Sequence, residues 1–467
     1  MTQKQFGWKM KIRSCGVLLI VTALLFSAAG CGGRSTVKDG NLDPDTNLVD
    51  LNISGNIVFT INNESGTETE GMAPRSFAEA FMSAYPGTTV TVREIKRDQY
   101  AQQVSAGTIG DVFWCDEPMA NTFHLEHNAI MPLDAYLKPL NIDIQQVYKG
   151  AIDCGMIEGR LYMAPRTMSQ QTLIYNVDAL REAGFLSEVA AGDALTWTRF
   201  SEICRSLNQS NPDGTYTQVG AAMKTWWFPV LVSFLEGWGG TWVDQEEKHV
   251  SFTSDPLVFQ GLSELFQAMN DGWLYPEDLG YSGDKNTAYA NLSAYNYVFR
   301  TFGTITWLTR YGNDYASAAI DWDICPFPQM PVHKVGAGAT GYVVYNRTAN
   351  PDTAAAFALF FLTEDGQLAY HGQTGGEIPL LSTLSEDPFW RGQGTPWPEK
   401  NYDAFISYPS ATTPATAVVQ VPPVVADLIS DNNLRTLFQK ILANEISMES
   451  AFSTLETQAN ELWARIS

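Results

Sequence analysis

Positive charge is scarce in this sequence. Its 467 residues hold 29 lysines and arginines against 51 aspartates and glutamates, a formal net charge of −22. Nucleic acids bind basic surfaces that neutralise phosphates, so this balance argues against a nucleic-acid partner. An acidic body also disfavours lying flat on anionic lipid. The surplus of acid does favour solubility.

Histidine is rarer still, with 5 residues. His124 and His127 lie three positions apart on a predicted helix with Glu126 between them, but a zinc site needs three or four ligands. We interpret the pair as part of a surface helix face and expect no metal.

Common catalytic motifs are also missing. The sequence has no HExxH, no GxSxG and no P-loop. Residues 336–341 fit GxGxxG, but the predicted strand 342–345 follows where a dinucleotide site requires a helix, so we expect these glycines to allow close backbone approach. We expect no cofactor and no enzymatic activity. Acidic residues are plentiful, so the sequence leaves open a pair of carboxylates in a cleft.

Cysteines are few and widely spaced, without a CxxC pair. Export from the cell would permit disulfides, and four cysteines allow three pairings. We favour free, buried thiols for the four cysteines of the body, which are Cys115, Cys154, Cys204 and Cys325.

Long apolar runs are confined to the N-terminus. A basic segment, 4–13, precedes the apolar stretch Cys15–Gly30, whose 16 residues are fewer than the roughly 20 of a spanning helix. Small residues then lead to Cys31, which is the layout of an export signal. Residues 28–31 resemble the bacterial lipobox, although Ala28 stands where leucine is usual.

The lipobox resemblance implies that residues 1–30 are a lipoprotein signal peptide and that Cys31 is lipidated. Two acyl chains would anchor the protein stably. An ordinary signal cut near Ala29, or an uncleaved helix, remains the alternative. The polar stretch 31–53 is typical of a flexible tether.

The rest of the chain alternates strand and helix patterns. Its length predicts two to three domains, and 45% hydrophobic residues can form large cores. Such alternation favours a mostly parallel sheet whose strand ends carry the ligand site, here residues 62–65 and 114–117. The predicted strands are 57–61, 88–94 and 111–114, and the predicted helices are 76–85, 100–106 and 119–128.

A second α/β region begins near Leu173. We predict two α/β lobes with more than one crossing between them, and no fixed-period repeat. The predicted helices are 177–183, 197–208, 228–236, 256–272 and those of the tail 422–466; residues 303–307 are predicted as a buried strand.

The order of these segments resembles the extracellular solute-binding proteins typified by maltose-binding protein, over roughly residues 54–467. Each motif alone is weak, but their collinear order behind a lipobox is specific. The matching segments are 110–114, 129–134, 173–184, 195–200, 239–242, 338–346, 354–362 and 376–379.

The resemblance implies an α/β, two-lobe fold of the periplasmic-binding-protein type II kind, with a hinge that closes on ligand. It implies an N-lobe of 54–171 and 333–385, and a C-lobe of 172–332 and 386–467. It also implies a monomer at the extracytoplasmic face of the membrane that delivers a sugar or oligosaccharide to the permease subunits of an ABC importer.

A sugar site needs aromatic plates for ring faces and polar groups for hydroxyls. Trp114 and Trp307 match family positions that stack on sugar, although core packing would also explain them. The full set of candidate ligand residues is Asn63, Glu64, Trp114, Asp116, Glu117, Arg166, Gln170, Trp226, Trp227, Trp307, Tyr342 and Glu377.

Two other functions stay open at this point. A surface-anchored carbohydrate-active enzyme would need two carboxyl groups about 5 to 10 Å apart across a cleft. A receptor for another solute, such as a peptide, would also use tryptophans. The aromatic content of 12% favours a sugar.

Overall fold

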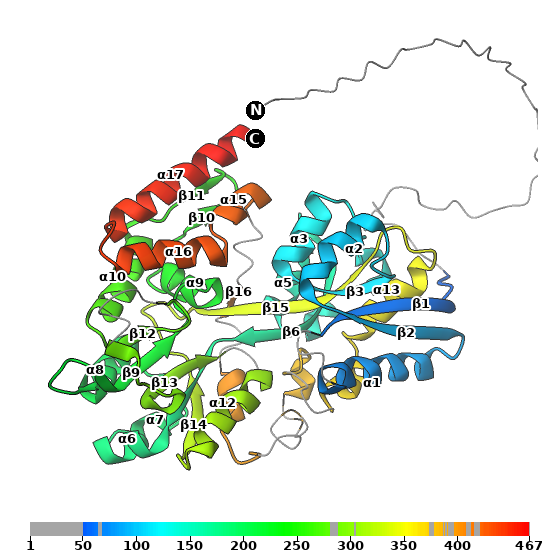
Figure 1. Cartoon of the computed structure of the whole chain (residues 1–467). Helices are drawn as coiled ribbons and strands as arrows, with labels where there is room; N and C mark the ends of the chain where they lie inside the picture. Colours follow the sequence, from blue (N-terminus) through cyan, green and yellow to red (C-terminus); the bar gives the residue numbers. More distant parts are fainter. Residues whose placement is uncertain are drawn as a thin grey trace, which may run out of the picture. The chain divides into compact units, whose positions relative to one another are not determined.

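The structure is a computed structural model (Figure 1). It describes residues 50–63, 68–280, 288–302, 305–372, 378–385, 387, 390, 397–407, 412–414 and 421–466. In these ranges no helix combines the length and apolar character that a membrane crossing requires. The four body cysteines are buried with free thiols, as predicted.

The first sheet has the strand order β16-β15-β3-β1-β2, and β6 pairs with β15 off this path (Figure 1). Strands β1, β2 and β3 are parallel, and β15 runs antiparallel to β3. Parallel neighbours need crossover helices, which the predicted β-α-β-α-β order supplies. The strands are β1 (Gly55–Asn62), β2 (Thr88–Ile95), β3 (Val112–Asp116), β6 (Met163–Gln170), β15 (Val335–Val344) and β16 (Thr412–Pro414).

Helices cover both faces of this sheet. Phe59 of β1 packs against Phe77 and Phe357, which come from α1 (Glu68–Ala84) and α13 (Pro351–Phe360). A second cluster packs Phe113 of β3 against α2 (Tyr100–Ala106) and α3 (Glu117–Leu125). Alternate residues of a strand point to opposite faces, so one sheet supports two cores.

Two glycines of β15 allow neighbouring backbone to pass closely. A Cβ atom on Gly341 would lie 2.3 Å from the carbonyl oxygen of Ala164, and one on Gly336 would lie 1.7 Å from that of Pro229. A Cβ on Gly338 would meet nothing within 4 Å. Two glycines of the GxGxxG pattern therefore permit close approach within a strand, as predicted, and no helix follows them.

The second sheet has the order β12-β9-β13-β7-β14, with β8 paired to β9. Strands β9, β12 and β13 are parallel, and β7 is antiparallel to its two neighbours. The strands are β7 (Thr172–Asn176), β8 (Gln209–Ser210), β9 (Tyr216–Met223), β12 (Leu274–Pro276), β13 (Tyr297–Phe302) and β14 (Trp322–Pro326).

Helices predicted along this region are present, and the tail forms three of them. They are α6 (Val177–Ala183), α8 (Trp197–Leu207), α9 (Phe228–Glu236), α10 (Pro256–Asn270), α15 (Pro423–Leu428), α16 (Asp431–Leu442) and α17 (Met448–Ile466). The strand predicted at 303–307 is wrong, because β13 ends at Phe302 and helix α12 (Ile305–Ser317) follows. A short apolar run does not distinguish strand from helix.

The chain passes between the two sheets at two described places. It leaves β6 at Gln170 and enters β7 at Thr172, and it returns from β14 at Pro326 to β15 at Val335. Strand β16 pairs with β15 in the first sheet, although the predicted lobe boundaries group residues 386–467 with the second. The boundaries themselves stay a prediction.

Candidate functional site

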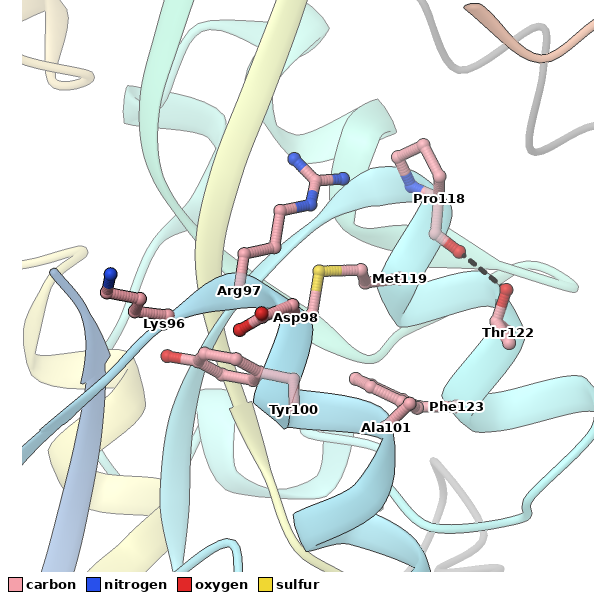
Figure 2. Close-up of a pocket in the computed structure, with 9 residues that line it drawn as sticks. All are labelled: Lys96, Arg97, Asp98, Tyr100, Ala101, Pro118, Met119, Thr122 and Phe123. Atoms are coloured by element: carbon pink, nitrogen blue, oxygen red, sulfur yellow. Dashed lines mark hydrogen bonds between the residues drawn. The ribbon is translucent and has the colours of Figure 1, made fainter. Parts of the chain in front are cut away.

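The carboxyl ends of β1 and β3 place polar residues at one edge of the first sheet, where ligands bind in open α/β sheets. A pocket of about 710 Å³ opens beside this edge (Figure 2). This volume lies within the range of small-molecule sites. Its walls come from the start of α2 with the preceding turn and from the first turns of α3, and they consist of Lys96, Arg97, Asp98, Tyr100, Ala101, Pro118, Met119, Thr122 and Phe123.

Trp114 lies on β3 next to this pocket. Its ring is half-buried and meets the edge of Tyr100, with ring centroids 5.9 Å apart. The guanidinium carbon of Arg97 lies 6.0 Å from the indole centroid. Two pocket residues therefore hold the indole in place, as a stacking platform requires.

Asp116 ends the same strand and caps α3. Its Oδ1 accepts the N–H of Met119 at 3.0 Å, and its Oδ2 pairs with Arg97. Burial raises the pKa of Asp116, and the positive charge of Arg97 opposes this rise. Asp116 is thus a fixed hydrogen-bond acceptor beside Trp114.

Glu117 turns inward instead. It is 3% exposed, and its Oε1 accepts the N–H of Ala339 on β15 at 2.6 Å. Burial raises the pKa of Glu117 to about 8, although hydrogen bonds from Cys154 and Ala339 lower it. The carboxyl holds the first turn of α3 against β15, which is a structural position.

The second sheet presents a matching edge after β9 and β12. Lys224 pairs with Asp278 at 2.9 Å. Trp226 is 8% exposed and donates its indole N–H to the carbonyl of Glu277 at 2.9 Å, while Lys224 and Arg435 lie 5.5 and 5.4 Å from its ring centroid. Trp227 is half-buried at the start of α9.

Asp431 joins this edge from the first residue of α16. It is exposed, and its Oδ1 accepts the N–H of Phe228 at 3.4 Å. Although its side chain is exposed at the surface, the protein around it partly shields the carboxylate from water, which raises its pKa; the charges of Arg97 and Lys224 lower the pKa, and Asp116 raises it further. Arg97, Asp116 and Lys224 therefore all lie within electrostatic reach of Asp431.

Sequence reasoning missed Arg97, Lys224 and Asp431. In the sequence each is an ordinary charged residue beside a helix or strand end, with no motif around it. Only the fold brings the three together. The one signal available was their position at element ends, which is where α/β proteins place ligand contacts.

Three other candidates make internal contacts. Asn63 is buried and donates to Glu94 at 2.7 Å. Arg166 donates to Thr340 at 3.0 Å and to the hydroxyl of Tyr370. Gln170 is buried and donates to the carbonyl of Ala404 at 3.1 Å.

Tyr342 lies in the aromatic core of the first sheet. Its ring is 1% exposed and meets the edge of Phe59 at 4.8 Å. Tyr342 belongs to the core cluster that contains Phe59, whereas its neighbour Val343 belongs to the cluster on the opposite face of the sheet. The structure therefore does not bring Tyr342 to the site edge.

Three candidates cannot be placed by their side chains. Glu64 and Glu377 lie outside the described residues. Trp307 lies in α12, and its side chain is not among those described.

The assembled groups suit a polar ligand with apolar faces. Trp114 offers a half-buried indole, and Asp116 and Asp431 offer hydroxyl acceptors. Arg97 and Lys224 donate hydrogen bonds. Within the described ranges no cluster of three or more histidine, cysteine or acidic side chains could hold a metal ion.

Solved structures with this fold are solute receptors. An ABC substrate-binding protein from Listeria monocytogenes, in complex with cycloalternan, has a TM-score of 0.67 at 16% identity and covers 88% of this chain and 99% of its own. The GacH receptor of Streptomyces glaucescens, solved unliganded and with acarbose, has a TM-score of 0.64 at 16% identity, with coverage of 88% and 99%.

A third solved structure binds a different class of solute. UgpB from Mycobacterium tuberculosis, in complex with glycerophosphocholine, has a TM-score of 0.63 at 18% identity and covers 88% of this chain and 99% of its own. These likenesses support the two-lobe α/β fold that the sequence predicted. No match to a curated protein sequence was found.

The family comparison covers most of the chain. Residues 65–368 match the family described as bacterial extracellular solute-binding protein. The segments that carried the resemblance in the sequence lie almost entirely within this range. The chain belongs to the bacterial extracellular solute-binding proteins.

Proposed function

We propose that this protein is a lipid-anchored receptor that captures a sugar or oligosaccharide outside the cell and delivers it to an ABC importer. The observation that carries the proposal is Trp114, an indole held by Arg97 and Tyr100 beside the acceptor Asp116. Ring faces and hydroxyls are the two features that such a pair recognises. Family membership supports the extracytoplasmic role.

Relatives of the same fold bind sugars and one non-sugar solute. Cycloalternan and acarbose are carbohydrates, and glycerophosphocholine carries a phosphate and a quaternary amine. A quaternary amine also stacks on indole, so a choline-type solute is the second candidate. The Arg97–Asp116 and Lys224–Asp278 ion pairs favour the neutral sugar, because each cation at the site already has a carboxylate partner.

A thermal-shift screen tests this proposal. Cycloalternan, acarbose and glycerophosphocholine are each added in excess to the purified body of the protein. A solute at 100 times its dissociation constant adds about 2.7 kcal/mol of stability. Stabilisation by a sugar supports the proposal. Stabilisation by glycerophosphocholine alone would support the choline-type receptor instead.

The receptor role implies binding without turnover. Prolonged incubation with cycloalternan, followed by chromatography of the sugar, should return it intact. Hydrolysis would favour the surface-anchored carbohydrate-active enzyme, with Asp116 and Asp431 as the first carboxyl pair to substitute.

The receptor is also expected to be a monomer. Light scattering of the purified protein should give the mass of a single chain.

The anchor is a separate part of the proposal. We infer that residues 1–30 are removed and that Cys31 carries the lipid, which tethers the body to the outer face of the cell membrane beside the permease subunits. Expressed in a bacterium, the full chain should partition with membranes, and the Cys31→Ser variant should not. Release of both forms into the medium would point to an ordinary signal peptide.

A further inference from the structure

Charged side chains from four separate elements meet at the candidate site. Arg97 precedes α2 and pairs with Asp116 at the end of β3. Lys224 follows β9. Asp431 begins α16 and accepts the N–H of Phe228, four residues beyond Lys224. Arg97 and Asp116 belong to the first-sheet edge, and Lys224 and Asp431 belong to the second.

Two observations bring these edges together. Helix α15, directly before α16, packs against α3, whose N-cap is Asp116. The pKa of Asp431 is raised by burial, and the charges of Arg97, Lys224 and Asp116 all act on it. Arg97 therefore pairs with Asp116 on one edge and acts electrostatically on Asp431 on the other.

Asp431 also retains binding capacity. Its side chain is exposed, and Oδ1 makes one long hydrogen bond of 3.4 Å. Among the described residues, Oδ2 has no hydrogen-bond partner. A carboxylate can accept several hydrogen bonds, so most of the capacity of Asp431 is available to a bound molecule.

We propose that Arg97 joins Asp116 and Asp431 into one charged cluster spanning the two sheets, and that Asp431 is a ligand-binding residue contributed by the C-terminal helices. This inference rests on the proposed function and extends it. A sugar that accepts from Arg97 and donates to both carboxylates would be held from both edges at once. Its binding would then stabilise the arrangement in which the edges approach.

The cluster gives binding a pH dependence. Both carboxylates accept hydrogen bonds from hydroxyl groups best when ionised, and desolvation by the surrounding protein raises the pKa of each. Acidification therefore removes acceptors, and affinity falls as the pH is lowered. The groups around Asp431 are Arg97, Asp116, Lys224 and the Phe228 N–H. Two further charges lie nearby. Asp278 pairs with Lys224, and Arg435, which shares α16 with Asp431, lies over the ring of Trp226.

A purely structural role makes a different prediction. A carboxylate in the first turn of a helix stabilises it through the helix dipole, and its loss would lower the melting temperature without changing affinity. Asp427 on α15 provides a matched control, because it is exposed and, within the described residues, its carboxylate makes no hydrogen bond.

The test uses cycloalternan, a sugar without an ionisable group, and calorimetric titration at about pH 7.5 and pH 5. We expect Asp431→Asn to bind about tenfold or more weakly than the parent at pH 7.5, since a hydrogen bond to a charged group is lost. The parent and Asp427→Asn should both weaken at pH 5, and Asp431→Asn should change less. Equal affinities of Asp431→Asn and Asp427→Asn would overturn the proposal.

A ligand-free measurement separates this inference from the proposed function. In a double-mutant cycle of Arg97→Gln and Asp431→Asn, unfolding constants come from urea titration. A departure from additivity of about twofold or more shows that the two charges interact, even if cycloalternan fails to bind. Additive effects would refute the cluster, whether or not a sugar binds.

Discussion

A single carboxyl group, Glu117, should make the free energy of unfolding of the whole protein depend on pH. Its pKa is about 8 in the folded state against an ordinary value of 4.5. Between these values the folded state binds a proton that the unfolded chain has lost. Stability therefore falls as the pH rises from about 4.5 to 8, and none of this loss exists below 4.5.

The Glu117→Gln substitution removes this titration. At pH 7 the parent carries a cost on the order of 3 kcal/mol from Glu117, which the amide avoids. Urea unfolding across this pH range should show a flatter profile for the variant, with the difference growing toward pH 8. Glu126→Gln, an exposed carboxylate just beyond α3, serves as control. Parallel profiles for parent and Glu117→Gln would show that Glu117 ionises normally.

The residue scale also shows how far sequence reasoning reaches. Trp114 and Asp116 were predicted, and the structure places both beside a pocket, because a strand end fixes their location. Tyr342 was predicted to line the cleft but lies in the core, because successive residues of a strand point to opposite faces and a glycine-rich segment does not show which face each residue takes. Asp431 was missed because it becomes a candidate only through its interaction with Arg97, which lies more than 300 positions away in the sequence.

At the scale of elements, β15 connects the parts of the site. It pairs with β3, which carries Trp114, and with β6, which leads to the second sheet. Its glycines make this possible, because the carbonyl oxygens of Ala164 and Pro229 pass where side chains would otherwise stand. Close approach of another backbone segment was predicted for these glycines, because the sequence after them is typical of a strand and not of the helix that a dinucleotide site requires.

Two glycines of β15 form a matched pair for testing this role. Gly341→Ala places a methyl group 2.3 Å from a backbone oxygen, whereas Gly338→Ala meets open space. We expect Gly341→Ala to destabilise the protein by about 1–3 kcal/mol, as overpacking does, and Gly338→Ala to be near neutral. Thermal unfolding measures both. Equal melting temperatures would mean that β15 shifts freely away from β6.

Elements were more predictable than their packing. The order of strands and helices followed from apolar periodicity and from turn residues, and most predicted segments are present. The prediction for 303–307 failed because a stretch of five residues with β-branched and aromatic side chains is too short to distinguish a strand from the start of a helix. Pairing of β16 with β15 could not be predicted, since two residue stretches about 70 positions apart meet only after the fold forms.

At the scale of the molecule, the proposal requires that ligand draws the two edges of the site together. A closed state that contacts sugar from both edges gains affinity, and the equilibrium shifts toward it. Small-angle X-ray scattering should show a smaller radius of gyration for the parent with saturating sugar than without it. Asp431→Asn should contract less at the same sugar concentration. An unchanged radius in the parent would remove hinge closure from the mechanism.

Calorimetric titration of cycloalternan and acarbose into the parent and Trp114→Ala addresses the sugar site directly. We predict one site per chain in the parent. We also predict a loss of about tenfold or more in Trp114→Ala, because the indole face that would cover the C–H face of a sugar ring is removed, and each 1.4 kcal/mol of binding free energy is about tenfold in affinity. Trp238→Ala, which removes a half-buried indole packed against the core of the second sheet, should bind as the parent does. Full affinity in Trp114→Ala, or no heat from either sugar in the parent, would contradict a sugar site at the end of β3.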